Sequence, residues 1–197
     1  FGDIIAQFRS EQEAYQGESF NAIVGYQSNG AIVHYHPDHH NSAEIKPEGI
    51  LLVDCGGQYL GGTTDITRTI ALSKPDQQQQ RHYTLVLKGH IAIARVIYPE
   101  GTCGAQLDVL ARQFLWQHGL NYLHGTGHGI GYFLNVHEGP HGFAGPGTEK
   151  GRTAFLPGMV ISNEPGLYLE NQYGIRIENV IVVSTTQVPG YLDFETV

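Results

Sequence analysis

Positively charged residues are scarce in this sequence, and long apolar runs are absent. There are 11 Lys and Arg residues against 19 Asp and Glu, which gives a formal net charge of −8 at pH 7. No window gathers Lys and Arg into a basic face, so we expect no nucleic-acid partner. No stretch reaches the roughly 18 apolar residues of a membrane span, and the first residues lack a signal-peptide layout. We therefore also expect no membrane partner.

Cysteine is rarer still, with only Cys55 and Cys103. Two isolated cysteines do not make a disulfide framework, and neither belongs to a CxxC pair of the kind found in zinc or redox sites. This usage fits a reducing compartment. We expect a cytoplasmic protein.

The remaining composition is typical of a folded domain. Hydrophobic residues make up 41% of the 197 positions and charged residues only 15%. This length falls within the range of a single domain. Both ends look cut, because the first residues resemble the tail of a helix and the last, YLDFETV, resemble a strand without a closing element. We expect residues 1–197 to be one domain from a longer, multidomain chain.

Apolar periodicity and turn residues predict two blocks of strands with helices between them. The first block comprises a hairpin turning at 28–30 and ending before Pro37, then strands at 50–54, around Tyr59 and at 64–72. Asp76 can cap a helix that runs until Pro99, and a second helix spans 105–118. Strands return at 158–164 and 173–183, so the second half repeats the order of the first.

Carboxylates recur at strand ends in both blocks. Asp54 and Asp65 lie in LLVDCGGQYLGGTTDITRT, while Glu164 and Glu178 lie in SNEPG and GIRIEN. An isolated Asp pair of this kind is commonly a pair of turn residues. With His128 of HGTGHG, however, the four carboxylates form a set that cannot be buried unpaired. Two divalent cations would neutralise it, and oxygen donors with one imidazole suit Mn²⁺, Co²⁺, Fe²⁺ or Zn²⁺.

The quoted motifs, together with LHGTGHGIGYFLNVHEGP, resemble those of the pita-bread metallopeptidases, and among these the Xaa-Pro aminopeptidases (aminopeptidase P). The resemblance runs over nearly the whole chain. It implies an α+β fold with a pseudo-twofold, curved antiparallel sheet backed by helices. It also implies two divalent ions, with Mn²⁺ favoured over Co²⁺ or Zn²⁺.

The same resemblance implies a role for each site residue. Asp54 would bind one ion, Asp65 and Glu178 would bridge both ions, and His128 with Glu164 would hold the second. Glu164 would also act as general base. Four further residues would complete the site: His137 at the carbonyl oxygen of the substrate, His34 and His124 on its prolyl side, and Arg176 as a partner of Asp54.

These features predict a catalytic domain that cleaves peptides whose second residue is proline. A prolidase restricted to dipeptides, a methionine aminopeptidase and a non-catalytic binding module are the alternatives. His36, His39 and His40 are better explained as a polar loop than as a metal-binding tract. Trp116 is better explained as a core residue or a subunit contact than as a catalytic residue, and a subunit contact would be consistent with a homodimer.

Overall fold

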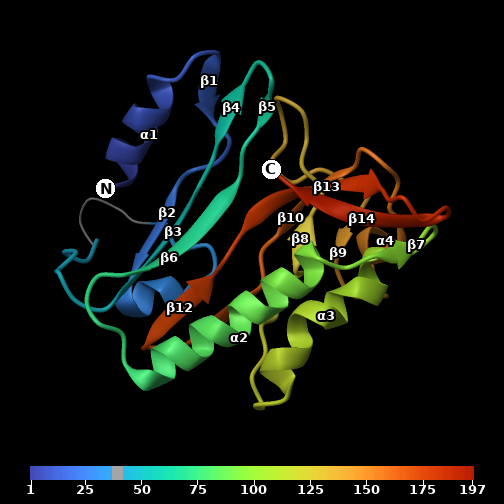
Figure 1. Cartoon of the computed structure of the whole chain (residues 1–197). Coiled ribbons are helices and arrows are strands. Elements are labelled where there is room, and N and C mark those ends of the chain that lie inside the picture. The colour runs from blue at the N-terminus through green and yellow to red at the C-terminus, as the bar shows by residue number, and fades with distance from the viewer. Residues whose placement is uncertain (37–41) are drawn as a thin grey trace.

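The computed structural model describes residues 1–36 and 42–197, and it contains helices and antiparallel strands, the α+β class expected from the sequence. Figure 1 shows two groups of strands, with α2 and α3 lying next to each other along one side. His39 and His40, considered above as part of a loop or metal tract, lie outside the described residues. Among the described residues, no helix combines the length and apolar character needed to cross a bilayer.

The first half of the chain forms two small sheets, in the orders β1-β4-β5 and β2-β3-β6. Its helical elements are α1 (Gly2–Ser10) and the 3₁₀ helix η1 (Gln27–Ala31). Its strands are β1 (Tyr15–Glu18), β2 (Ile23–Tyr26), β3 (Ile50–Cys55), β4 (Gly57–Tyr59), β5 (Gly62–Thr63) and β6 (Ile66–Ala71). All six residues of β3 are buried because this strand is central in its sheet.

The hairpin expected around residues 28–30 is wrong. Strand β2 pairs with β3, and the turn residues form η1 instead of a connection to a second strand. The reason is tertiary packing, since Gly30 in η1 lies directly against the main chain of Gly174 in β12. A local turn signal cannot anticipate a partner so distant in sequence.

The middle of the chain holds the two long helices, α2 (Gln77–Ala94) and α3 (Gly104–Trp116). Asp76 starts α2 with a capping box, in which its side chain accepts from Gln79 N at 2.7 Å and Gln79 Oε1 accepts from Asp76 N at 3.0 Å. The helix ends at Ala94, short of the expected Pro99. Tyr98 is buried and pairs with Leu192, which requires an extended backbone in β7 (Tyr98–Pro99).

The second half returns to strands. Its elements are β8 (Gly127–His128), β9 (Gly142–Phe143), the short helix α4 (Glu149–Arg152), β10 (Val160–Asn163), β11 (Gly166–Leu169), β12 (Tyr173–Arg176), β13 (Asn179–Thr185) and β14 (Tyr191–Thr196). The expected strand at 173–183 is divided into β12 and β13, which belong to different sheets. The break falls at Ile177 and Glu178, so Glu178 lies at the junction of these sheets.

The two halves meet where β6 lies beside β12. Thr69 Oγ1 donates to Arg176 O at 2.9 Å and accepts from Arg176 N at 3.0 Å, while Glu178 N donates to Thr67 O at 3.2 Å. Buried apolar residues of α2 and α3 pack behind this junction, joined by Ile50 of the first half. The junction therefore holds carboxylates of both halves against a continuous core.

Candidate metal centre

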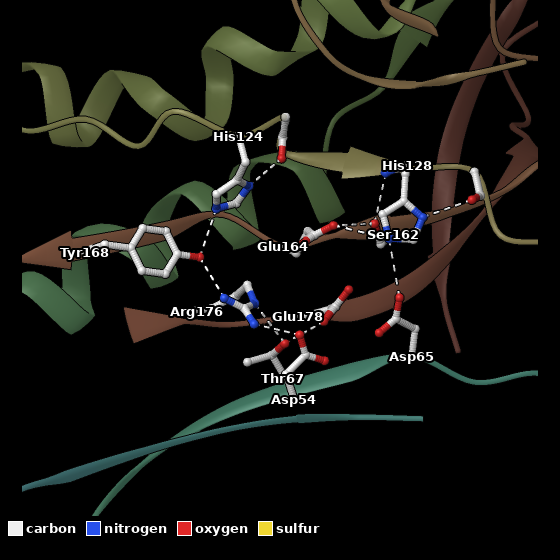
Figure 2. Close-up of polar contacts among 12 residues, drawn as sticks. Asp54, Asp65, Thr67, His124, His128, Ser162, Glu164, Tyr168, Arg176 and Glu178 are labelled. Carbon is white, nitrogen blue, oxygen red and sulfur yellow. Dashed lines mark hydrogen bonds and ion pairs between the residues drawn. The ribbon is translucent and has the colours of Figure 1, made fainter. Parts of the chain in front are cut away.

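The five residues expected to bind metal lie together at the junction of the halves. Asp54 is on β3, Asp65 lies just before β6, His128 is on β8, Glu164 follows β10 and Glu178 separates β12 from β13. Figure 2 shows their side chains directed toward a common space between the strands. The structure thus brings together residues that lie more than a hundred positions apart in the chain.

Distances within the cluster are short. His128 Nε2 lies 3.4 Å from Asp65 Oδ2 and 3.3 Å from Glu164 Oε1. Asp65, His128 and Glu178 each present a ligand atom, and these three atoms lie within 4.8 Å of one another. Three donors at this spacing can contact one ion, and carboxylates can be shared with a second ion roughly 3.5–4 Å away.

Arg176 is the fixed positive charge inside the cluster. Its Nη2 donates to Asp54 Oδ2 at 2.6 Å, the partner that the sequence resemblance implied, and its Nη1 donates to the hydroxyl oxygen of Tyr168 at 2.9 Å. Burial acts to lower its pKa, but Tyr168, Asp54 and Glu164 outweigh that effect, and the pKa is raised. One guanidinium faces four carboxylates, so much negative charge remains for cations to balance.

The acid–base properties of the carboxylates reflect this excess. Burial raises the pKa of Asp54 and of Glu178, and it raises that of Glu164 to about 7. Burial alone would lower the pKa of His128, but hydrogen bonding to Asp65 and the charge of Glu164 raise it. Without cations the cluster therefore retains protons that bound cations would displace.

An unpartnered oxygen supports the fit to a cation. Asp54 Oδ1 is buried and has no hydrogen-bond partner among the described residues, whereas its Oδ2 is held by Arg176. A buried carboxylate oxygen without a donor is costly unless an ion or ordered water contacts it. The donor set, four carboxylates and one imidazole, suits hard or borderline divalent ions.

The histidines assigned to substrate contacts lie around the cluster. The ring of His137 lies 3.9 Å from that of His128, between centroids, and its side chain is exposed at the rim. His34 is exposed after η1 and close enough to His124 and His137 to influence their pKa values. Burial lowers the pKa of His124 to about 4.

His124 belongs to a chain of hydrogen bonds that ends on Asp54. Its Nδ1 is 2.7 Å from the carbonyl oxygen of Gly125, so this nitrogen carries the proton, and Nε2 accepts from the Tyr168 hydroxyl at 2.8 Å. Tyr168 in turn accepts from Arg176. Burial raises the pKa of Tyr168 to about 12, which keeps its proton in place.

The sequence motifs assigned no role to three hydroxyl residues that lie at the site: Thr67, Ser162 and Tyr168. Ser162 Oγ donates to Glu164 Oε1 at 3.0 Å and accepts from His128 N at 2.9 Å, so it links two of the expected ligands. Thr67 Oγ1 donates to Glu178 Oε2 at 2.6 Å. Tyr168 lies two residues after the quoted SNEPG motif and four residues after Glu164, and this proximity was the available signal.

Comparisons with known proteins agree with this geometry. The model of metallopeptidase family M24 matches residues 2–185. A probable Xaa-Pro aminopeptidase P of Laccaria bicolor is 48% identical over 201 residues, covering 99% of this chain and 31% of that protein. A probable Xaa-Pro aminopeptidase P of Tuber melanosporum is 52% identical over 181 residues, covering 92% of this chain and 29% of that protein. The chain thus spans about a third of the length of these relatives.

Solved structures are similar over the whole chain. An X-prolyl aminopeptidase of Caenorhabditis elegans, described as a cytosolic enzyme with a di-nuclear active site, has a TM-score of 0.93 and 40% identity, covering 99% of this chain and 32% of that one. A prolidase of Thermococcus sibiricus has a TM-score of 0.81 and 28% identity, covering 98% of this chain and 49% of that one.

Proposed function

This chain belongs to metallopeptidase family M24, and from that premise we propose that it hydrolyses the bond between an N-terminal residue and a following proline. The observation that carries the proposal is the convergence of the five expected ligand side chains on one space between the strands (Figure 2). Among the described residues, the buried Oδ1 of Asp54 in this cluster has no hydrogen-bond partner. The structural relatives also confirm the α+β pita-bread fold that the sequence resemblance implied.

Two divalent ions would occupy the cluster. Asp54 would hold one ion, Asp65 and Glu178 would bridge both, and His128 with Glu164 would hold the other. The close approach of ligand atoms from Asp65, His128 and Glu178 supports this assignment. So does the di-nuclear site described for the Caenorhabditis elegans enzyme. Oxygen-rich donors favour Mn²⁺, with Co²⁺ or Zn²⁺ as alternatives.

The ions, when bound, would polarise the scissile carbonyl and lower the pKa of the attacking water. Glu164 would accept the proton of that water and return it to the proline nitrogen, because its carboxylate lies inside the cluster, 3.3 Å from His128 Nε2, and the adjacent cations would set its pKa. Ser162 fixes one oxygen of Glu164 by donating to it, which leaves the other free for the proton.

The surrounding histidines would orient the substrate. His137, at the rim beside His128, would donate to the carbonyl oxygen of the peptide. His34 and His124 would line the prolyl side, where the His124 ring is held by Tyr168. An Xaa-Pro amide has no N–H and restricts the conformation of the preceding residue. A pocket specific for it therefore needs a complementary shape and a hydrogen-bond donor to the substrate carbonyl, more than an acceptor for an N–H.

A prolidase restricted to Xaa-Pro dipeptides is the second candidate, because a prolidase of Thermococcus sibiricus shares the fold. The relatives named Xaa-Pro aminopeptidase P are more similar in sequence, which favours longer peptides as substrates. The description of one relative as cytosolic supports the cytoplasm as the place where such peptides would be met.

The test is hydrolysis by metal-stripped protein titrated with Mn²⁺. An Arg-Pro-Pro peptide and the Arg-Pro dipeptide would be compared, with Asp65→Ala as the ligand-removal control. We expect release of Arg from the longer peptide that rises with Mn²⁺ and is absent in the variant. Cleavage of the dipeptide alone would establish the prolidase instead. Failure to cleave either substrate in protein that binds two ions would contradict peptidase activity of this chain.

A further inference from the structure

Thr67 occupies a central position in the site that no metal-ligand motif assigns. It lies on β6, its side chain is completely buried, and it faces the second half of the chain. Its Oγ1 donates to Glu178 Oε2 at 2.6 Å and accepts from Arg176 Nε at 3.1 Å. Figure 2 shows Thr67 beside Asp54, with the Arg176 guanidinium and Glu178 next to it.

The direction of these hydrogen bonds is determined by chemistry. The guanidinium of Arg176 has donors only, so Thr67 Oγ1 must accept from Nε. The single hydroxyl proton of Thr67 is then directed to Glu178 Oε2. Arg176 also donates from Nη2 to Asp54 Oδ2. One cation therefore holds Asp54 directly and Glu178 through the Thr67 hydroxyl, which places the two carboxylates in a defined relative orientation.

The hydroxyl is not needed to hold the strands together. Thr67 O already accepts from Glu178 N, and Thr69 bonds both main-chain groups of Arg176. Thr69 is thus a hydroxyl residue on the same strand and the same buried face, yet its hydrogen bonds go to main chain only. The Thr67 hydroxyl is the one that reaches a carboxylate.

We propose that Thr67 is a positioning residue of the metal centre, whose hydroxyl orients the Glu178 carboxylate for the ions and couples it to the guanidinium that holds Asp54. This inference rests on the proposed function, since it assigns Glu178 to a shared position between two ions. Partners that orient a ligand commonly contribute 10–100-fold to metal affinity. Only one carboxylate oxygen is restrained in this way, so the other remains available to a cation.

The experiment compares Thr67→Val with Thr102→Val in the whole chain. Thr102 is also buried, and its hydroxyl donates to the main-chain oxygen of Pro99. Valine keeps the shape of threonine but removes the hydroxyl. Mn²⁺ binding to metal-stripped protein would be measured by isothermal titration calorimetry, and thermal unfolding in EDTA would show that each variant is folded. We expect Thr67→Val to bind Mn²⁺ about 10–100-fold more weakly. Thr102→Val should stay within about threefold of the unsubstituted chain, because its hydroxyl bonds neither a proposed ligand nor Arg176.

Thr67→Ser provides the rescue, because it restores a hydroxyl and should recover Mn²⁺ affinity. A merely structural role would instead make Thr67→Val and Thr102→Val equivalent in Mn²⁺ affinity, which would overturn the inference. Unchanged Mn²⁺ affinity in Thr67→Val would overturn it while leaving the proposed function intact. If the unsubstituted chain binds no Mn²⁺, the inference and the proposed function both fail. Should Thr67→Val not fold, Thr67→Ala removes the same hydroxyl without placing a second methyl group beside the carboxylates.

Discussion

Arg176 donates a 2.6 Å hydrogen bond from Nη2 to Oδ2 of Asp54, and the two residues are 122 positions apart in the chain. Both side chains are buried, at 2% and 10% exposure respectively. The contact joins β12 of the second half to β3 of the first, beside the proposed ions. It therefore serves the fold and the site together, because the guanidinium that pairs the halves also fixes one carboxylate of the metal cluster.

Replacing Arg176 with methionine should be strongly destabilising. The variant keeps the length of the side chain but leaves Asp54 buried without its cation, and removing one partner of a buried ion pair typically costs about 3–5 kcal/mol. Urea unfolding at pH 8 in EDTA measures the free energy directly. Arg152→Met, at an exposed position, is the matched control and should stay within about 0.5 kcal/mol. Equal stability of the two variants would contradict a buried pair.

Much of the site was predictable because its residues lie in motifs that also govern the local fold. Asp54 lies in a completely buried strand that its apolar run predicts, and Glu178 lies in the GIRIEN motif, although the break in the strand beside it was not expected. The helix cap at Asp76 was predictable for the same reason, since the capping box is formed within four residues. Features of this kind depend on near neighbours in sequence.

Features that depend on distant partners were not predictable. The hydroxyls of Thr67 and Ser162 look like ordinary strand residues until the strands that face them are known. The expected hairpin at 28–30 failed likewise, because η1 packs on β12 and β2 takes its partner from β3. The sequence contains the turn signal but not the competing contact.

The metal-free protein should show a pH-dependent contribution from Glu164. Burial raises its pKa to about 7 from an ordinary value of 4.5. A carboxyl with a raised pKa stabilises the folded state when protonated, so its contribution is complete below pH 4.5 and is lost as pH rises toward 7. The difference in unfolding free energy between the unsubstituted chain and Glu164→Gln should therefore fall by about 2 kcal/mol over that range.

Comparing the unsubstituted chain with Glu164→Gln removes the contribution of His124 from this effect. Burial lowers the pKa of His124 to about 4, so its contribution increases as pH rises and opposes that of Glu164. His124 is present in both proteins, and its contribution cancels in the difference. Glu170→Gln, at an exposed position, should give a difference that does not change with pH. A flat difference for Glu164→Gln as well would show that the carboxyl is not buried in the folded protein.

Arg112 should control the order of the loop that carries His124. Its Nη1 donates to Tyr122 O at 2.6 Å and its Nη2 to His124 O at 2.7 Å, while its guanidinium pairs with Asp108. Asp108 in turn accepts from Thr126. Arg112→Met would leave both carbonyl oxygens without this donor, which should destabilise the loop by about 1–3 kcal/mol. We expect hydrogen exchange to accelerate across residues 120–128.

The control for that measurement is Arg95→Met, at an exposed position after α2. It should leave exchange in the loop unchanged. Acceleration spread evenly over the chain in Arg112→Met would indicate global destabilisation and would contradict a local clamp. Faster hydrogen exchange confined to residues 120–128, together with weaker peptide turnover, would show that the Arg112–Asp108 pair on α3 controls the position of His124.

Gly127 should tolerate no side chain, although its neighbour His128 is the expected ligand. A Cβ at this position would overlap the carbonyl oxygen of Ser162, which belongs to the main chain of β10 and cannot rotate away. Gly127→Ala must therefore separate β8 from β10 and displace His128 from Glu164. We expect a loss of Mn²⁺ affinity and an unfolding free energy lower by about 1–3 kcal/mol, as for an overpacked buried site. Gly61→Ala has open space around its Cβ and should change neither quantity. Because β8 consists of two residues only, a shift of the main chain at Gly127 also displaces its neighbour, the expected ligand His128. Retention of full Mn²⁺ affinity in Gly127→Ala would mean that His128 is not held by this close approach of the strands.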